Sequence, residues 1–245
     1  MRTLSTLCCI ILVLVVGARA PGQLATAQEA PDPDPSPAVD EGGAGFFAIG
    51  TNVIGIDALN DRLESFGYPT FGSAFLSLGG GGYGLVGGRF VLGGEGHGLI
   101  RPAQSVGGRE VTAGGGYGLA TLGYLAVAQS NWRVYPQVGV GAGGLTLDIG
   151  STGAVTDFDD VLDDPNRRAE LTRGSLLVSL AVNLTYDAFS APEDEGGFRV
   201  GLQAGYLLAP LSSDWQLDDA TLDDGPDAGF GGPFVRLLIG GGSGR

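Results

Sequence analysis

The segment Arg173–Phe189, RGSLLVSLAVNLTYDAF, separates apolar from polar side chains with a period of two. Every second residue across 176–186 is apolar, and most of the residues between them are small or polar. Side chains alternate across a strand, so this pattern predicts a strand with one apolar face. The apolar set is longer than the roughly 5–6 residues of an ordinary strand and fits the roughly 9–11 residues of a tilted, membrane-spanning strand.

Seven further strands are predicted around this segment, at 45–56, 72–86, 89–100, 109–128, 132–149, 198–208 and 229–240. Four connections between strands are long, at 57–71, 101–108, 150–172 and 209–228, and they alternate with short ones such as the turn at Gly87-Gly88. A meander with its long loops at one end and tight turns at the other is the layout of membrane-spanning barrels. The sequence therefore predicts an all-β fold, an eight-stranded antiparallel up-and-down transmembrane β-barrel.

One short helix interrupts the strand pattern, at Asp57–Gly67, between the first and second strands. Leu59, Leu63 and Phe66 recur at helical spacing, and Gly67 can adopt the left-handed backbone conformation that ends a helix. This stripe is expected to pack on the rim of the sheet. A helix that lies on a membrane surface or binds a partner is the alternative.

Charge is distributed unevenly along the chain. Of the 27 acidic residues, only Glu95, Glu110, Asp148 and Asp187 fall in predicted strands, which is too few for a barrel wall that faces water. All 13 basic residues are arginine, which excludes a Walker phosphate loop and a Schiff-base lysine. The formal net charge of -14 would repel a phosphate backbone, so no nucleic-acid partner is expected.

The first part of the chain has the features of a secretory signal. Arg2, an apolar run across 7–16 and the small-residue pattern ending at Ala27 predict a signal peptide at 1–27, and this run is short for a transmembrane helix. Cleavage after Ala20 and retention of the segment as a membrane helix are the alternatives. Residues 28–44 mix proline with acids and predict an extended linker, residues 45–240 form the barrel, and 241–245 are a tail.

Polar and charged side chains occur on the face of the strands opposite the apolar one. Inside a narrow barrel they would have to pair with one another. The predicted lumen network consists of Arg89, Glu95, His97, Arg133, Gln137, Asp187, Arg199, Gln203 and Arg236. Four aromatic residues near strand ends are predicted to lie at the membrane interfaces, namely Tyr124, Trp132, Tyr186 and Tyr206.

Three motifs in the sequence could carry chemistry. Glu95 and His97 lie two residues apart on one strand face, as a general base and its orienting carboxylate would, but no serine stands in a GxSxG turn to act as nucleophile. GYGLVG at 82–87 fits GxGxxG but leads into a strand, so it lacks the helix that holds a dinucleotide. The aspartate pairs at 159–160, 163–164, 218–219 and 223–224 lack the spacing of a calcium loop, and no metal or cofactor is predicted.

From Gly45 to Gly240 this layout resembles the small bacterial outer-membrane β-barrels of the eight-stranded OmpA/OmpX type. The resemblance implies a bacterial outer-membrane location, contact with outer-membrane lipid and lipopolysaccharide, insertion by the outer-membrane assembly machinery, and a monomer. In one respect the chain departs from it. Such barrels usually finish on an aromatic residue that the assembly machinery reads, whereas PFVRLLIGGGSGR ends at Arg245.

Three functions are consistent with these patterns. The first is a non-catalytic outer-membrane barrel with a structural or surface-interacting role, or a very narrow pore, because side chains largely fill an eight-stranded interior. The second is a barrel-embedded, lipid-modifying hydrolase that uses His97 as its base. The third is a secreted, soluble β-barrel that carries a ligand, which would be recovered without detergent.

Overall fold

The computed structural model describes residues 42–151, 168–189, 197–218 and 220–243, all within the compact unit Val39–Arg245. The predicted signal peptide and nearly all of the predicted linker lie outside the described residues. Within the described residues, no helix has the length and apolarity that crossing a membrane requires.

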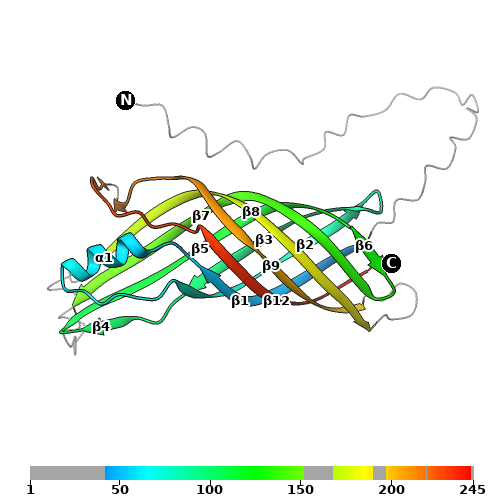
Figure 1. Cartoon of the computed structure of the whole chain (residues 1–245), viewed down its shortest axis with the longest axis horizontal. Helices are drawn as coiled ribbons and strands as arrows, with labels where there is room; N and C mark the ends of the chain where they lie inside the picture. Colours follow the sequence, from blue (N-terminus) through cyan, green and yellow to red (C-terminus); the bar gives the residue numbers. More distant parts are fainter. Residues whose placement is uncertain (1–41, 152–167, 190–196, 219, 244–245) are drawn as a thin grey trace, which may run out of the picture. The chain divides into compact units, whose positions relative to one another are not determined.

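Eight long strands form a closed antiparallel barrel, which confirms the predicted fold class (Figure 1). In order around the wall they are β1 (Gly43–Val53), β2 (Ala74–Val86), β3 (Phe90–Ile100), β5 (Arg109–Tyr124), β7 (Trp132–Ser151), β8 (Arg168–Phe189), β9 (Gly197–Ser212) and β12 (Gly232–Ser243). The ring closes where β12 pairs with β1, from Gly43↔Ser243 to Asn52↔Phe234. Each of the eight long strands therefore has two hydrogen-bonded neighbours, and the wall has no free edge.

The two ends of the barrel differ. The turn end holds the tight turn at 87–89, the beginning of β1 and the end of β12. The loop end holds the helix α1 (Asp57–Ser65) and the short strand β4 (Gln104–Val106), which lie together at one end of the barrel in Figure 1. Long connections thus gather at one end, as predicted.

The predicted alternation of β8 is confirmed residue by residue. Leu180, Val182 and Leu184 face outward and are exposed, whereas Ala181 and Asn183 between them are buried inside the barrel. The other strands of the wall also carry exposed apolar residues, including Phe47, Ile49, Leu76, Phe90, Leu92, Leu122, Val138, Val140, Leu202, Leu208, Val235, Leu237 and Ile239. The outer wall is therefore apolar around its whole circumference.

A buried apolar layer, the apolar cap, fills the barrel at the loop end. It is built from the inward side chains of the strand ends and from the helix and loops above them, including Ile54, Leu59, Leu63, Phe71, Phe75, Leu99, Val111, Leu147, Leu177, Leu207, Trp215 and Phe230. Asn60 of α1 fastens the returning chain: its Nδ2 donates to the Phe71 carbonyl at 2.7 Å, and its Oδ1 accepts from the Phe71 amide at 3.1 Å. The helix packs over the barrel mouth as predicted, but Phe66 lies beyond its last residue and is exposed.

Several boundaries differ from the prediction because strands continue beyond the barrel wall. β4 pairs with the start of β5, and the predicted strand at 109–128 is divided into β5 and β6 (Val127–Gln129). The predicted open loop at 150–172 is shorter, since β7 and β8 pair as far as Gly150↔Arg168. The loop after β9 contains two further short strands, β10 (Gln216–Leu217) and β11 (Ala220–Thr221). β1 begins within the predicted linker, and β12 continues into the predicted tail.

Some glycines that face the barrel interior leave space for a large side chain on the neighbouring strand. A Cβ on the inward-facing Gly79 would collide with the ring of His97, its partner on β3. A Cβ on the outward-facing Gly96 would meet nothing closer than the Tyr117 carbonyl oxygen at 3.7 Å, an ordinary contact. Inward glycines such as Gly79 therefore make room for large side chains on the neighbouring strand.

Candidate functional site: the polar interior

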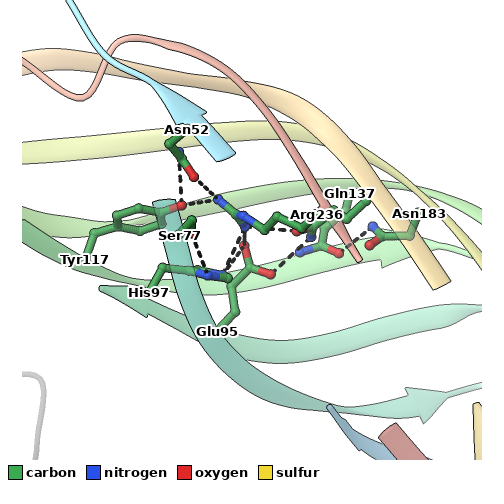
Figure 2. Close-up of polar contacts among 9 residues, drawn as sticks. Asn52, Ser77, Glu95, His97, Tyr117, Gln137, Asn183 and Arg236 are labelled. Carbon is green, nitrogen blue, oxygen red and sulfur yellow. Dashed lines mark hydrogen bonds and ion pairs between the residues drawn. The ribbon is translucent and has the colours of Figure 1, made fainter. Parts of the chain in front are cut away.

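Arg236 of β12 is the centre of a buried polar cluster at mid-height in the barrel (Figure 2). Its side chain is fully buried, and its guanidinium Nη1 donates to Gln203 Oε1 at 2.9 Å and lies 3.4 Å from Glu95 Oε1. The second carboxylate oxygen of Glu95 accepts from Gln203 Nε2 at 3.1 Å. The charges of Arg236 and Glu95 would be costly to bury alone, and here they pair with each other and with the amide of Gln203.

The other guanidinium nitrogen, Nη2, points to β1 and β5. It donates to Asn52 Oδ1 at 3.3 Å and to the Tyr117 hydroxyl, and Asn52 Nδ2 lies 3.4 Å from the same hydroxyl. The rings of Phe234 and Tyr117 also face the guanidinium, with centroids 4.0 and 5.7 Å from its Cζ. Side chains of β1, β3, β5, β9 and β12 therefore meet on one cation.

His97 is held in its neutral form by this geometry. Its Nε2 lies 3.0 Å from Arg236 Nη1, and a guanidinium has only donors, so Nε2 must accept. The ring proton is then on Nδ1, which faces Ser77 Oγ at 3.5 Å. Glu95 Oε1, 3.9 Å from Nε2, consequently faces an imidazole without charge.

This arrangement is the reverse of what a histidine base requires. A base takes a hydroxyl proton with its acceptor nitrogen, but here the acceptor nitrogen faces Arg236 and the protonated one faces Ser77. Ser77, Glu95 and His97 are also buried inside the closed wall. The geometry of these residues therefore gives no support to the hydrolase hypothesis.

The remaining predicted network residues fall into two separate groups and one outlier. Asn183 Nδ2 donates to Gln137 Oε1 at 2.8 Å, beside the Arg236 cluster and to its right in Figure 2. Nearer the turn end, Asp187 pairs with Arg133 at 3.2 Å and with Arg199 at 2.5 Å. The predicted network is thus divided along the axis of the barrel.

Arg89 does not belong to the lumen, and its assignment to the network was wrong. It lies in the turn at 87–89 rather than in β3, it is exposed, and its Nη1 donates to the Tyr124 hydroxyl at 3.0 Å. This hydrogen bond raises the pKa of the Arg89 guanidinium above its ordinary value. The predicted turn was Gly87-Gly88, whereas the observed turn also includes Arg89. Arg89 therefore lies outside β3 and does not follow the alternation of that strand.

Sequence reasoning missed five partners in the interior, namely Asn52, Ser77, Tyr83, Tyr117 and Asn183. All five occupy inward positions of their strands, so parity was the signal that could have found them. They are neutral, whereas the prediction was built mainly on charged residues.

The four predicted interfacial aromatics lie on the wall. Tyr124, Trp132 and Tyr206 are exposed, and Tyr186 is partly buried. The rings of Trp132 and Tyr186 are 4.7 Å apart, and those of Phe90 and Tyr124 are 5.7 Å apart in an edge-to-face arrangement. Three of the four, all except Tyr206, thus cluster at the turn end, and their interfacial role stays a prediction.

Among the residues that the structure describes, no group of three histidine, cysteine, aspartate or glutamate side chains is placed to hold a metal ion. The aspartate pairs at 159–160 and 163–164, and one member of the pair at 218–219, lie outside the described residues.

Comparison with solved structures gives a distant likeness of fold. No family model matches the sequence, and no curated protein matches it. Among solved structures, the barrel is similar to the crystal structure of Ail, the attachment invasion locus protein of Yersinia pestis, with 11% sequence identity and a TM-score of 0.39. The alignment covers 82% of this chain and 94% of that one.

Proposed function

We propose that the chain is a non-catalytic β-barrel of the bacterial outer membrane, which acts through the surface at its loop end and does not conduct solutes. The observation that carries this proposal is the inverted polarity of the barrel. Apolar side chains such as Leu180 and Val182 are exposed on the wall, while charged ones such as Glu95 and Arg236 are buried inside it. A water-soluble carrier would bury the first set and expose the second.

A location in the membrane is supported by the free-energy cost of leaving the apolar outer wall in water. Leaving the outer apolar wall in water forfeits roughly 25 cal/mol per Å² of apolar surface, and such surface extends around all eight long strands. Closed barrels satisfy every backbone group of the wall internally, which is the condition for spanning lipid. Outer-membrane lipid and lipopolysaccharide are the proposed surroundings of this wall, and a monomer is the proposed state.

Two layers of the interior support a closed lumen. At mid-height, Asn52, Gln203 and Arg236 are at most 1% exposed, so water does not reach them along the axis. At the loop end, the apolar cap fills the space above them. An eight-stranded barrel has an interior that side chains can fill, and here both layers do so. This argues for the structural or surface-interacting role over the narrow pore.

The last strand is compatible with membrane insertion despite its unusual ending. β12 pairs with β1 on one side and with β9 on the other, and its outward residues Val235, Leu237 and Ile239 are exposed. We propose that this apolar strand, with Phe234 on its inner face, is what the assembly machinery reads.

The experiment that tests the proposal is extraction followed by a gel-mobility assay. The full chain should fractionate with outer membranes, require detergent for release, and migrate differently before and after boiling, because a closed barrel resists detergent until heated. Recovery in the soluble periplasmic fraction, or identical mobility in both lanes, would contradict it. A planar-bilayer recording of the same preparation should show no stepwise conductance.

A further inference from the structure

His97 is the single histidine of the chain, and it is buried at mid-height in the barrel. Histidine is the side chain whose charge ordinarily changes between about pH 5 and about pH 8. A change of charge at this position would act on the same cluster that fills the lumen around Arg236 (Figure 2). The contacts of His97 therefore decide how the barrel responds to acid.

The side chains around the imidazole ring and its direct partners come from six strands. Among the described residues, those that carry a charge or can ionise are Glu95 on β3, Tyr117 on β5 and Arg236 on β12. The neutral ones are Asn52 on β1, Ser77 on β2 and Gln203 on β9. With a neutral imidazole the cluster contains one carboxylate and one guanidinium, so its charges balance.

A second proton on the imidazole would find no acceptor. It would have to go on Nε2, because Nδ1 already carries a proton, and Nε2 lies 3.0 Å from Arg236 Nη1. Two donors would then face each other. Glu95 Oε1 is 3.9 Å from Nε2, which is too far for a hydrogen bond, and the other carboxylate oxygen accepts from Gln203.

A charged imidazole would also unbalance the cluster. His97 and Arg236 would share the single carboxylate of Glu95, in an interior where these three side chains are at most 2% exposed. An unpaired charge without water around it is costly, and a like charge at 3.0 Å adds repulsion. The cluster is therefore complementary to the uncharged ring alone.

The ring has little room to move away from Arg236. On one side is the backbone of β2, where a Cβ on Gly79 would be 2.4 Å from His97 Nδ1. On the other side is the ring of Tyr117, whose centroid is 5.2 Å from that of the imidazole. Close packing on both sides opposes a rotation that would turn Nε2 towards Glu95.

We propose that His97 makes the barrel acid-sensitive, because the cluster at mid-height accommodates only the uncharged imidazole. The unfolded chain binds the second proton below the ordinary pKa of histidine, about 6.5. A fall in pH favours the state that binds more protons, so stability that is present above about pH 6.5 is lost progressively below it. This behaviour depends on the interior of the barrel and not on its proposed location in a membrane.

The test is reversible urea unfolding of the untagged chain, folded in detergent, at about pH 7.5 and about pH 5. His97→Gln is measured beside it, because an amide oxygen at this position can accept from Arg236 and stays uncharged at both pH values. The unfolding equilibrium constant of the unchanged chain should rise about 30-fold more than that of His97→Gln. An equal rise in the two proteins would overturn the proposal.

Thr121→Val is the matched control for a substitution in the interior. Thr121 is also buried, on an inward position of β5, and the hydrogen bonds of His97 do not include it. This variant should keep the pH dependence of the unchanged chain. If its pH dependence fell as far as that of His97→Gln, a general loosening of the interior would account for the result and the proposal would fail.

Nuclear magnetic resonance of the chain labelled with ¹⁵N only in histidine reads the same residue without any substitution, because the label reports on a single side chain. At about pH 7.5 the signal should be that of a neutral ring protonated on Nδ1, and the folded barrel should keep this signal at about pH 5. A ring protonated on Nε2 alone, or a charged ring in the folded barrel at about pH 5, would contradict the proposal.

Discussion

Gly50 of β1 lies directly opposite Arg236 of β12, and a Cβ on Gly50 would be 2.9 Å from Arg236 Cγ and 2.7 Å from its Cα. The largest fully buried side chain of the barrel therefore crosses the lumen from a position whose neighbour has no side chain. The polar cluster depends on this pairing of a small residue with a large one.

Gly50→Ala should consequently destabilise the barrel by about 1–3 kcal/mol, because overpacking forces the guanidinium away from its partners. Urea titration of the detergent-folded protein, followed on gels of unboiled samples, measures the change. Gly96→Ala is the control: it adds the same methyl group on the outer face, where the space is open, and should change stability by no more than about 0.5 kcal/mol. Equal effects of the two substitutions would mean that Arg236 does not fill the lumen as described.

The ion pair between Arg236 and Glu95 should show strong coupling in a double-mutant cycle. Arg236→Met alone leaves a buried carboxylate without its cation, which costs about 3–5 kcal/mol of unfolding free energy. Combining it with Glu95→Gln removes the orphaned charge, so the double variant should be more stable than Arg236→Met. Additive losses, measured by the same urea titration, would show that the two side chains do not interact in the folded protein.

The apolar cap should stabilise the folded barrel, and its loss should not open the lumen to ions. Leu63→Ala removes a buried side chain that packs α1 over the barrel mouth and should cost about 2–5 kcal/mol, as large-to-small core substitutions do. The bilayer conductance of this variant should stay at zero, because the Arg236 cluster still fills the lumen below. Phe66→Ala, at a position 63% exposed, should leave stability within about 0.5 kcal/mol. Conductance that appears in Leu63→Ala would identify the cap as the only seal.

The architecture was predictable from the sequence because a period of two is a local signal. Each residue of β8 is assigned to a face by its neighbours alone, and the closed ring follows from eight such strands and the alternation of loop lengths. The registers were not predictable, since they depend on contacts between distant strands. Arg236 and Glu95 are far apart in the sequence, and nothing local indicates that they meet while Asp187 pairs with Arg133 and Arg199 instead.

The extensions beyond the wall were missed for a related reason. Residues 168–172 contain Arg168 and Glu170, which indicate an exposed loop by composition. In the structure they continue β8 because β7 pairs with them, and Arg168 reaches Glu110 of β5 at 2.5 Å. Pairing with a neighbouring strand overrides local composition at such positions.

The most direct test of the inverted barrel is the collision of spin labels with oxygen, which concentrates in lipid, and with a nickel chelate, which stays in water. The labels are placed at Val182→Cys on β8, Val235→Cys on β12 and Phe66→Cys beside α1, with Cys8 and Cys9 replaced by serine, and the protein is folded into lipid vesicles. Labels at 182 and 235 should collide mainly with oxygen, and the label at 66 mainly with the nickel chelate. If the nickel chelate reached positions 182 and 235 as freely as position 66, the apolar wall would not face lipid.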